Sequence, residues 1–198
     1  MLEKKKSAEN IYSKFGNKIN MSKIGKKPII IPQGVTIEEQ EKDFLIKGPK
    51  GEVKINKIQY VKVAIKDNQI ELILNKNIKQ GRSNWGTLRS LLNGAVIGVT
   101  AGFIKNLEIN GVGMRYTIEG KNVILNVGFS HPVKFPIPDG ITIEIEKNIM
   151  KISGFNKDLV GRTAANIRAI KKPEPYKGKG IKYVGEIIIR KAGKKTGA

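Results

Sequence analysis

An internal repeat constrains the fold of this chain more than any other feature of its sequence. A shift of about 80 residues superimposes Val53-Lys54-Ile55 on Val133-Lys134-Phe135. The same shift superimposes Gly81-Arg82-Ser83 on Gly161-Arg162-Thr163. A single shift that matches glycines, β-like segments and helix-like segments together indicates a duplicated unit rather than a chance alignment. We therefore expect two domains of the same fold.

Hydrophobic residues recur with two different periods in each half of the repeat. Between residues 28 and 74 they alternate with polar residues in short runs that end at turns rich in Gly, Pro, Asp and Asn, which is typical of antiparallel strands. A helix is predicted next, with one apolar face made of Trp85, Leu88, Leu92 and Ala95. The second half repeats this order, with strands between residues 107 and 152 and a helix that we expect to be capped near Asn156.

Together, the repeat and the periods predict an α+β fold with two duplicated domains. We expect a mostly antiparallel β-sheet with one covering helix in each domain, followed by a basic C-terminal tail. Tyr183 and the run Ile187-Ile188-Ile189 are predicted to form the final strand of the second sheet. The predicted boundaries are residues 1–20 for a flexible basic N-terminal extension, 21–102 for the first α+β repeat, 103–190 for the second, and 191–198 for the tail.

The charge of the chain indicates a polyanionic partner. Lys and Arg number 37 against 17 Asp and Glu, which gives a formal net charge of +20. So large an excess destabilises a compact state unless anions are nearby. Nucleic acid is therefore the leading predicted partner, and an anionic membrane surface is the second. The longest apolar runs are far shorter than the roughly 20 residues of a membrane-spanning helix.

No catalytic or metal-binding pattern is found in the sequence. The chain has no cysteine and a single histidine, His131, which is too few for the usual zinc sites. The nucleophile motif Gly-x-Ser-x-Gly is missing. Near the C-terminus, Gly193-Lys194-Lys195-Thr196 is similar to the end of a phosphate-binding loop, but Ile188 stands where that motif requires glycine. We therefore expect no enzyme activity, no metal and no cofactor, and a turn position for His131.

A basic stretch near the C-terminus, residues 171–183, carries the most distinctive chemistry. Pro173 and Pro175 end the preceding helix and are expected to hold the chain as a rigid, extended strap. Lysines then alternate with glycines, which open the backbone to close approach, and tyrosines flank them with flat faces for stacking. This combination suits a phosphate backbone with unstacked bases. The alternative is a solvated, charged loop.

Cations continue from the second predicted helix through this stretch into the tail. One or two of them suit the dipole at the end of the helix, but their number exceeds that need. We therefore expect one basic face on the second repeat, built from the helix end, the strap and the tail, as the main nucleic-acid-binding surface. The candidate binding residues are Arg162, Arg168, Lys171, Lys172, Tyr176, Lys177, Gly178, Lys179, Gly180, Lys182, Tyr183, Arg190, Lys191, Lys194 and Lys195.

Several segments resemble the bacterial-type large-subunit ribosomal protein six family. The most specific is the run Pro173-Glu174-Pro175-Tyr176-Lys177-Gly178-Lys179-Gly180-Ile181-Lys182-Tyr183. Also similar to family stretches are Met21-Ser22-Lys23-Ile24-Gly25-Lys26-Lys27-Pro28-Ile29, Ile46-Lys47-Gly48-Pro49-Lys50-Gly51, Gly111-Val112-Gly113 and Gly128-Phe129-Ser130-His131-Pro132. The resemblance covers about residues 21–195. Family members are built from two similar α+β domains, which agrees with the internal repeat.

This resemblance implies a structural role in the large ribosomal subunit. It implies binding to large-subunit ribosomal RNA (rRNA) near its 3′ end, beside the factor-binding region that includes the sarcin–ricin loop and the stalk base. The candidate residues would then neutralise rRNA phosphates, stack on bases and stabilise the tertiary structure of the RNA in support of translation. Neighbouring large-subunit proteins and nearby translation factors are the other implied partners, with no membrane contact, no homo-oligomer and no catalysis.

Two other functions stay open at this point. A general RNA- or DNA-binding protein, or an RNA chaperone outside the ribosome, would bind both nucleic acids equally. A peripheral membrane protein would need a basic amphipathic helix with a strongly apolar opposite face, but both predicted helices need their apolar faces for the sheets. Residues 1–20 fit a basic arm, an upstream start or an organelle-targeting segment. The leading expectation for the compartment is the cytoplasm, within the ribosome, with an organellar ribosome as the alternative.

Overall fold

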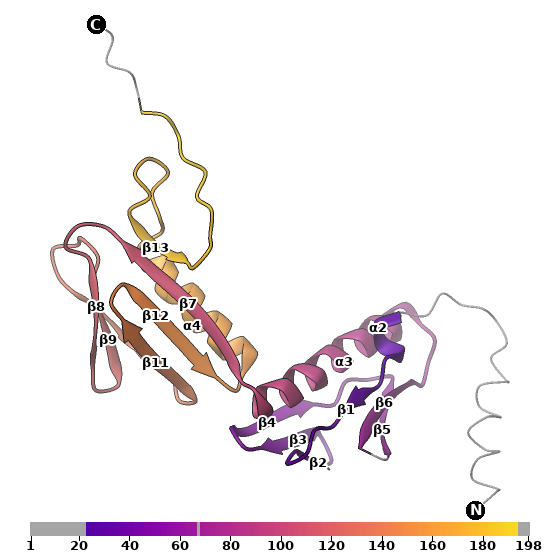
Figure 1. Cartoon of the computed structure of the whole chain (residues 1–198). Coiled ribbons are helices and arrows are strands. Elements are labelled where there is room, and N and C mark those ends of the chain that lie inside the picture. Colours follow the sequence, from indigo (N-terminus) through magenta and orange to yellow (C-terminus); the bar gives the residue numbers. More distant parts are fainter. Residues whose placement is uncertain (1–22, 67, 194–198) are drawn as a thin grey trace, which may run out of the picture. The chain divides into compact units, whose positions relative to one another are not determined.

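The computed structural model describes residues 23–66 and 68–193 (Figure 1). The predicted N-terminal extension and the candidates Lys194 and Lys195 lie outside the described residues. The described chain forms two compact units, one with residues 23–29 and 58–89 and the other with residues 30–57 and 90–193. This division falls within the first predicted repeat, so the predicted domain boundaries stay a prediction.

The first repeat consists of short strands followed by a long helix. Its strands form two sheets, with the orders β2-β3-β4 and β1-β6-β5. The helix buries the predicted face of Trp85, Leu88, Leu92 and Ala95, and the indole N–H of Trp85 donates to the carbonyl of Leu72 at 3.0 Å. The elements are α2 (Lys23–Lys26), β1 (Ile29–Ile30), β2 (Thr36–Glu39), β3 (Asp43–Gly48), β4 (Gly51–Asn56), β5 (Val61–Lys66), β6 (Gln69–Leu74) and α3 (Lys79–Thr100).

The second repeat follows the same order and adds one strand after its helix. Its sheets have the strand orders β10-β9-β8 and β11-β12-β7-β13. The elements are β7 (Phe103–Asn110), β8 (Arg115–Glu119), β9 (Asn122–Asn126), β10 (Val133–Pro136), β11 (Ile141–Glu146), β12 (Ile149–Gly154), α4 (Lys157–Ile170) and β13 (Gly180–Tyr183).

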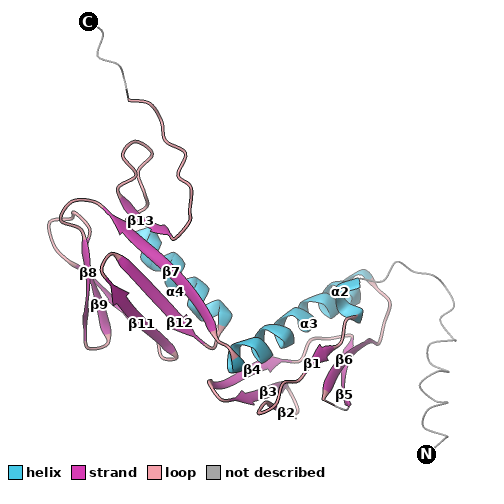
Figure 2. Ribbon diagram, in the orientation of Figure 1, coloured by secondary structure: helices cyan, strands magenta, loops and turns pink. Residues whose placement is uncertain are grey.

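The shared strand plan confirms the predicted duplication and the α+β class. In the hairpin β5–β6, Val61 pairs with Leu74. In the hairpin β11–β12, Ile141 pairs with Gly154, which lies at the predicted shift of about 80 residues. Each repeat also contains a three-stranded antiparallel sheet made of consecutive strands, β2-β3-β4 or β8-β9-β10. The strands of each repeat are therefore divided between two sheets (Figure 2).

The core of the second repeat lies between α4 and the four-stranded sheet. Helix α4 contacts β7, β12 and β13. Its buried residues follow the spacing of one helical face and are Val160, Thr163, Ala164 and Ile167. They meet Leu107, Met150 and Ile152 of the sheet, which are fully buried. No helix within the described residues is both long and apolar enough to cross a membrane.

Asn156 sets the start of α4, as predicted. Its Oδ1 accepts hydrogen bonds from the backbone N–H groups of Asp158 and Leu159, at 3.0 and 3.2 Å, and so pairs donors that the first helical turn leaves free. Replacing Asn156 by alanine is expected to lower the free energy of unfolding by about 1 kcal/mol, as measured by urea denaturation. The same change at Asn166, which is exposed on α4, is the control and should cost less than about 0.5 kcal/mol. Equal losses would contradict the capping role.

The final strand is shorter than predicted. β13 ends at Tyr183, and a turn follows in which Gly185 has a φ of +83°. The side chains of Ile187 and Ile189 are 91% and 87% exposed, so the prediction that they extend the strand is wrong. The reason is a tertiary contact, because the carboxylate of Glu186 is bound by Arg168 of α4 and directs the chain away from the sheet.

Candidate nucleic-acid interface

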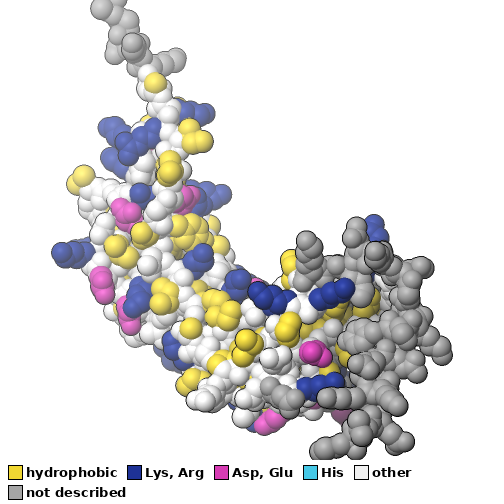
Figure 3. All heavy atoms as spheres, turned by 45° about the vertical axis from the view of Figure 1, so that its right-hand side comes forward, with side chains coloured by type: hydrophobic (Ala, Val, Ile, Leu, Met, Phe, Trp, Pro, Cys, Tyr) yellow, Lys and Arg dark blue, Asp and Glu magenta, His cyan; other side chains and the backbone are white. Residues whose placement is uncertain are grey.

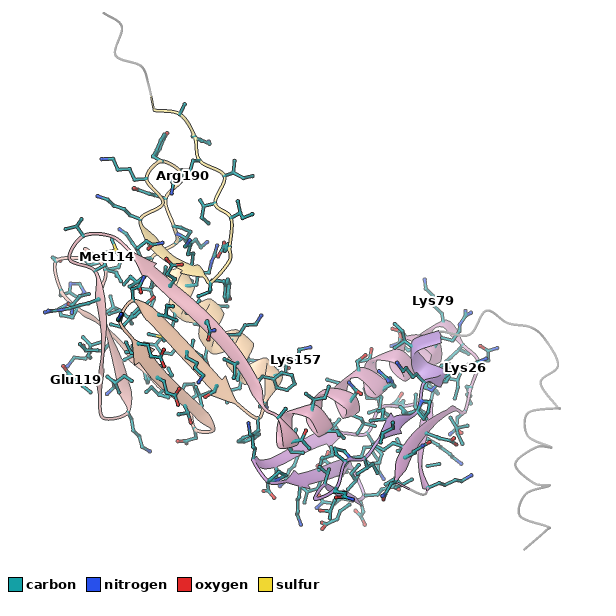
Figure 4. The ribbon with its side chains drawn as sticks, in the orientation of Figure 1. Lys26, Lys79, Met114, Glu119, Lys157 and Arg190 are labelled. Atoms are coloured by element: carbon teal, nitrogen blue, oxygen red, sulfur yellow. The ribbon has the colours of Figure 1, made fainter. Side chains whose placement is uncertain are left out.

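Three connections meet at one end of the second repeat. β13 pairs with the end of β7, with Gly180 opposite Asn110, so the connection that enters β13 lies beside the one that leaves β7. Met114 of the β7–β8 connection (Figure 4) contacts the β9–β10 connection, since a Cβ atom at Gly128 would lie 3.7 Å from its Cε. The Nζ of Lys171, just after α4, lies 5.0 Å from the ring centroid of Phe129. The β9–β10 connection thus lies between the other two.

The connection between α4 and β13, together with Gly180 at the first position of β13, is called the C-terminal loop (residues 171–180). Helix α4 ends before the prolines, as predicted, but the prediction of an extended strap is wrong. The N–H of Glu174 donates to the carbonyl of Lys179 at 2.9 Å, and the N–H of Ile181 donates to the carbonyl of Lys171 at 2.8 Å. These bonds close the segment on itself and leave its middle, residues 175–177, as an exposed turn (Figure 1).

Both glycines of the C-terminal loop are required by its own backbone. Gly178 has a φ of +72° and Gly180 a φ of +135°, values that residues with a Cβ atom rarely adopt. A Cβ atom at Gly180 would also lie 2.7 Å from the carbonyl oxygen of Lys172. The close approach of a partner at these glycines stays a prediction, because the loop's own conformation accounts for both of them.

The first residues of the tail run beside the C-terminal loop. The N–H of Lys191 donates to the carbonyl of Pro175 at 2.9 Å, and a guanidinium nitrogen of Arg190 would lie 3.7 Å from a Cβ atom at Gly178. Figure 3 shows Lys and Arg side chains around this loop and tail. The exposed candidates brought together here, called the C-terminal basic surface, are Lys172, Tyr176, Lys177, Lys179, Arg190 and Lys191.

An ion pair between Arg168 and Glu186 fixes the direction in which the tail leaves β13. Arg168 donates to both carboxylate oxygens of Glu186, from Nε at 3.0 Å and from Nη2, and the backbone N–H of Tyr183 donates to the same carboxylate at 2.9 Å. The two charged side chains are only 26% and 24% exposed. The side-chain hydrogen bond is the main cause that lowers the pKa of Glu186 and raises the pKa of Arg168.

Besides Lys171, which lies beside Phe129, three further predicted binding residues have side-chain partners within the chain. Arg168 binds Glu186, and its guanidinium carbon lies 5.7 Å from the ring centroid of Tyr183. The Nζ of Lys182 lies 3.4 Å from a carboxylate oxygen of Glu108, and both side chains are about three-quarters buried. These contacts give Arg168, Lys182 and Tyr183 structural roles, so a contact of these residues with nucleic acid stays a prediction.

Arg162 is separated from the other candidates along α4. It is exposed and precedes the last helical residue, Ile170, by about two turns, or roughly 12 Å along the helix axis. A ligand that spans the C-terminal basic surface would have to extend along α4 to reach it. The binding role of Arg162 therefore also stays a prediction.

Two exposed apolar residues at this end of the repeat were not among the predicted binding residues. Val112, in the β7–β8 connection, is 97% exposed, and Phe129, in the β9–β10 connection, is 46% exposed. Both follow a glycine in a short turn-rich segment, and an apolar residue in such a setting has little chance of being buried. An apolar residue directly after a glycine in a turn-rich segment could therefore have been predicted to be exposed. His131, also in the β9–β10 connection, lies exposed in a bend, as predicted.

The described residues hold no group of three or more His, Cys, Asp or Glu side chains that could bind a metal ion. Two acids near the C-terminal basic surface, Glu186 and Glu108, bind cations of the chain itself, whereas Glu174 of the C-terminal loop has no ion pair with another described residue. The five exposed cations of the surface outnumber this one unpaired acid, so the exposed charge of this end is positive.

Comparison with known proteins identifies the family. Residues 31–102 and 110–184 match the family model described as Ribosomal protein L6. The chain belongs to the ribosomal protein L6 family. The two matched segments fall in the two repeats of the fold, and the family predicted from the sequence is confirmed.

Curated relatives agree with membership of the L6 family. The protein named "Large ribosomal subunit protein uL6" from Beijerinckia indica subsp. indica is 49% identical over 176 residues, which cover 88% of this chain and 99% of the relative. The protein of the same name from Trichlorobacter lovleyi is 49% identical over 88% of this chain and 98% of its own length. The one from Staphylococcus carnosus is 47% identical with the same coverage.

Proposed function

We propose that this L6-family protein is a structural constituent of the large ribosomal subunit and binds large-subunit rRNA through the C-terminal basic surface. The observation that carries the proposal is the closed C-terminal loop, which holds Lys172, Lys177 and Lys179 beside Arg190 and Lys191. The relatives carry the name of a large-subunit protein. The role is to stabilise the tertiary structure of the RNA without catalysis.

Phosphates are the groups that the surface fits best. Its five cations are attached to a backbone whose conformation is already held by hydrogen bonds within the chain. Little ordering of the loop is therefore needed when a partner binds. Neutralising about five phosphates would give a slope of log affinity against log salt of about −4 to −5. Recognition would depend on RNA shape, because the major groove of an A-form helix is too deep and narrow for side chains to reach the bases.

Exposed apolar and aromatic side chains give the surface a second kind of contact. Tyr176 is 57% exposed at the tip of the C-terminal loop, where its ring can stack on a base or a sugar. Phe129 lies next to Lys171 on the neighbouring connection. Stacking of one base on an aromatic ring contributes about 1–3 kcal/mol, so an unpaired or bulged nucleotide would fit this end better than a continuous duplex.

The place in the subunit is proposed from the family resemblance. By this resemblance, the second repeat would contact large-subunit rRNA near the 3′ end of the RNA, beside the factor-binding region that includes the sarcin–ricin loop and the stalk base. Neighbouring large-subunit proteins would be further partners, and translation factors would pass nearby. The proposed compartment is the cytoplasm.

Sucrose-gradient sedimentation of a cell lysate tests this function. The protein should travel with the large subunit at one copy per particle and stay there as the salt concentration rises through the physiological range. Recovery at the top of the gradient, or spread over all nucleic acid with early loss in salt, would instead favour a general nucleic-acid-binding protein.

Replacing Lys177 and Lys179 together by alanine is expected to weaken binding to large-subunit rRNA. The slope of log affinity against log salt should become less steep by about 1–2, because each lost phosphate contact removes about 0.9. Filter binding at several salt concentrations measures it. The matched control replaces Lys121 and Lys157, which are exposed outside the C-terminal basic surface; Figure 4 labels Lys157, at the other end of α4 from the C-terminal loop. Equal slopes for the two double variants would place the main contact elsewhere.

A further inference from the structure

The excess of positive charge in the first repeat lies in one of the two compact units. Residues 30–57 hold five lysines and five acids, and two of these lysines pair with Glu38 and Glu39. Residues 23–29 and 58–89, which belong to the other compact unit, hold nine Lys and Arg residues against Asp67 and Glu71 alone. The first repeat therefore has its own strongly basic part, separate from the C-terminal basic surface.

Tertiary contacts bring five of these cations to the start of α3. Gly25 of α2 lies against the indole of Trp85, and the Nε of Arg89 donates to the carbonyl of Lys27 at 3.2 Å, so α2 rests on α3. The carbonyl of Lys76 contacts Gly81 in the first turn of α3. The cations gathered in this way, called the first-repeat basic surface, are Lys26, Lys27, Lys76, Lys79 and Arg82.

These five side chains are exposed and have no ion pair with another described residue. Figure 4 shows Lys26 on α2 and Lys79 at the start of α3 at the same end of that helix. Their mutual repulsion is therefore not relieved within the described part of the chain. Such a cluster is stabilised when a polyanion lies across it.

The two long helices begin with opposite chemistry. Helix α4 starts with the cap Asn156 and the acid Asp158, both of which suit the positive end of a helix dipole. Helix α3 has no acid in its first turn, which instead contains Lys79 and Arg82. Cations at this end oppose the dipole, so the cluster is unfavourable for the isolated fold and favourable only next to an anion.

We propose that the first-repeat basic surface is a second RNA-binding surface, which takes the phosphate backbone of a double-helical segment of large-subunit rRNA. The proposal rests on the proposed function, since it takes rRNA as the polyanion. The exposed helix surface next to the cations carries Ser83, whose hydroxyl group suits phosphate and ribose contacts. The hydroxyl of Thr87, also exposed there, donates to the carbonyl of Ser83 at 3.1 Å and remains an acceptor.

The first test compares two triple variants of the full chain for binding to transcribed large-subunit rRNA. Replacing Lys76, Lys79 and Arg82 by glutamine should make the slope of log affinity against log salt less steep by about 2–3. The control replaces Lys42, Lys54 and Lys121, exposed lysines outside this surface, by glutamine. The fluorescence of Trp85, the only tryptophan, checks that all variants are folded.

The outcomes separate the inference from the proposed function. A slope of log affinity against log salt that is less steep for the Lys76, Lys79 and Arg82 variant than for the control variant supports the second RNA surface. Equal slopes for the two variants, with tight binding by the unmodified protein, overturn it and leave the proposed function intact. A failure of the unmodified protein to bind large-subunit rRNA more tightly than an unrelated transcript overturns the proposed function itself.

The second test places a probe on the surface within assembled subunits. Because the chain has no cysteine, a Ser83→Cys variant accepts a single tethered iron–EDTA group, which cleaves RNA backbone nearby. The expected result is cleavage of rRNA by the group tethered at position 83 and weaker cleavage by the same group in a Lys54→Cys control. Normal incorporation without cleavage from position 83 would overturn the proposal and indicate that a protein covers this surface.

Discussion

Replacing Gly180 by valine should be the most damaging single change to the proposed RNA-binding end. It is expected to lower the free energy of unfolding by about 4 kcal/mol, from backbone strain of about 1–3 kcal/mol and overpacking of similar size. For a chain of this length the melting temperature should fall by about 8–16 °C. Thermal unfolding followed by circular dichroism measures it.

The size of this effect follows from where Gly180 lies. It is buried at the first position of β13, its φ is +135°, and a Cβ atom would meet backbone oxygens of Lys171 and Lys172 at 2.9 and 2.7 Å. Backbone atoms cannot move aside as a flexible side chain does. Valine would therefore separate β13 from the start of the C-terminal loop and break the hydrogen bond from Ile181 to Lys171.

Gly161 provides the matched control for Gly180. It lies inside α4, where a Cβ atom would have no neighbour within 4 Å. Gly161→Ala should leave the stability unchanged or raise it by about 0.5–1 kcal/mol, because alanine favours the helix. If the melting temperature of Gly180→Val stayed within about 2 °C of that of the unmodified protein, the loss of unfolding free energy would be less than about 1 kcal/mol. That result would show that the loop is not closed as described.

Replacing Glu186 by glutamine is expected to lower the free energy of unfolding by about 1–2 kcal/mol at neutral pH. Hydrogen bonds to charged groups contribute about 1.5–3 kcal/mol, and the partial exposure of this pair, about a quarter of each side chain, reduces that value. Glutamine leaves Arg168 without its anion and weakens the bond from the N–H of Tyr183. Urea denaturation measures the loss.

The pH dependence identifies the ion pair as the source of the Glu186 effect. The pKa of Glu186 is lowered in the folded protein, first of all by its hydrogen bond with Arg168. The carboxylate therefore stabilises the fold fully above its ordinary pKa of about 4.3 and loses this effect as the pH falls through the lowered folded value. The difference between the unmodified protein and Glu186→Gln should shrink over that acidic range.

Glu119 serves as the control carboxylate for Glu186. It is exposed at the end of β8 (Figure 4), and no ion pair joins it to another described residue. Glu119→Gln should change the free energy of unfolding by less than about 0.5 kcal/mol at every pH. A difference for Glu186→Gln that stayed constant from neutral to acidic pH would contradict the role of its charge.

Local sequence rules predicted the repeating elements of this protein well. The alternation of hydrophobic and polar residues predicted the strands, and the three- to four-residue spacing of Trp85, Leu88 and Leu92 predicted the buried face of α3. Both patterns are informative because they reflect which side of a strand or helix faces the core. The cap Asn156 was predictable for the same local reason, since its partners are only two and three residues away.

The candidate site was predicted less completely than the fold. Composition indicated the basic C-terminal end, but an exposed cation and a paired one look alike in a sequence. Lys177 and Lys179 are exposed, whereas Lys182, three residues later, lies against Glu108 of another strand. The partner is more than 70 residues away in the chain, so no local pattern could distinguish the two cases.

By itself, the sequence determined the α+β class, the duplicated strand plan, the excess of positive charge and the family of this protein. These properties depend on periodicity, composition and the order of residues. Only the tertiary structure decided that the proline-rich stretch closes into a loop, that Ile187 and Ile189 leave the sheet, and that cations of α2 gather at the start of α3. Each of these depends on contacts between residues far apart in the chain, such as Arg168 with Glu186 and Gly25 with Trp85.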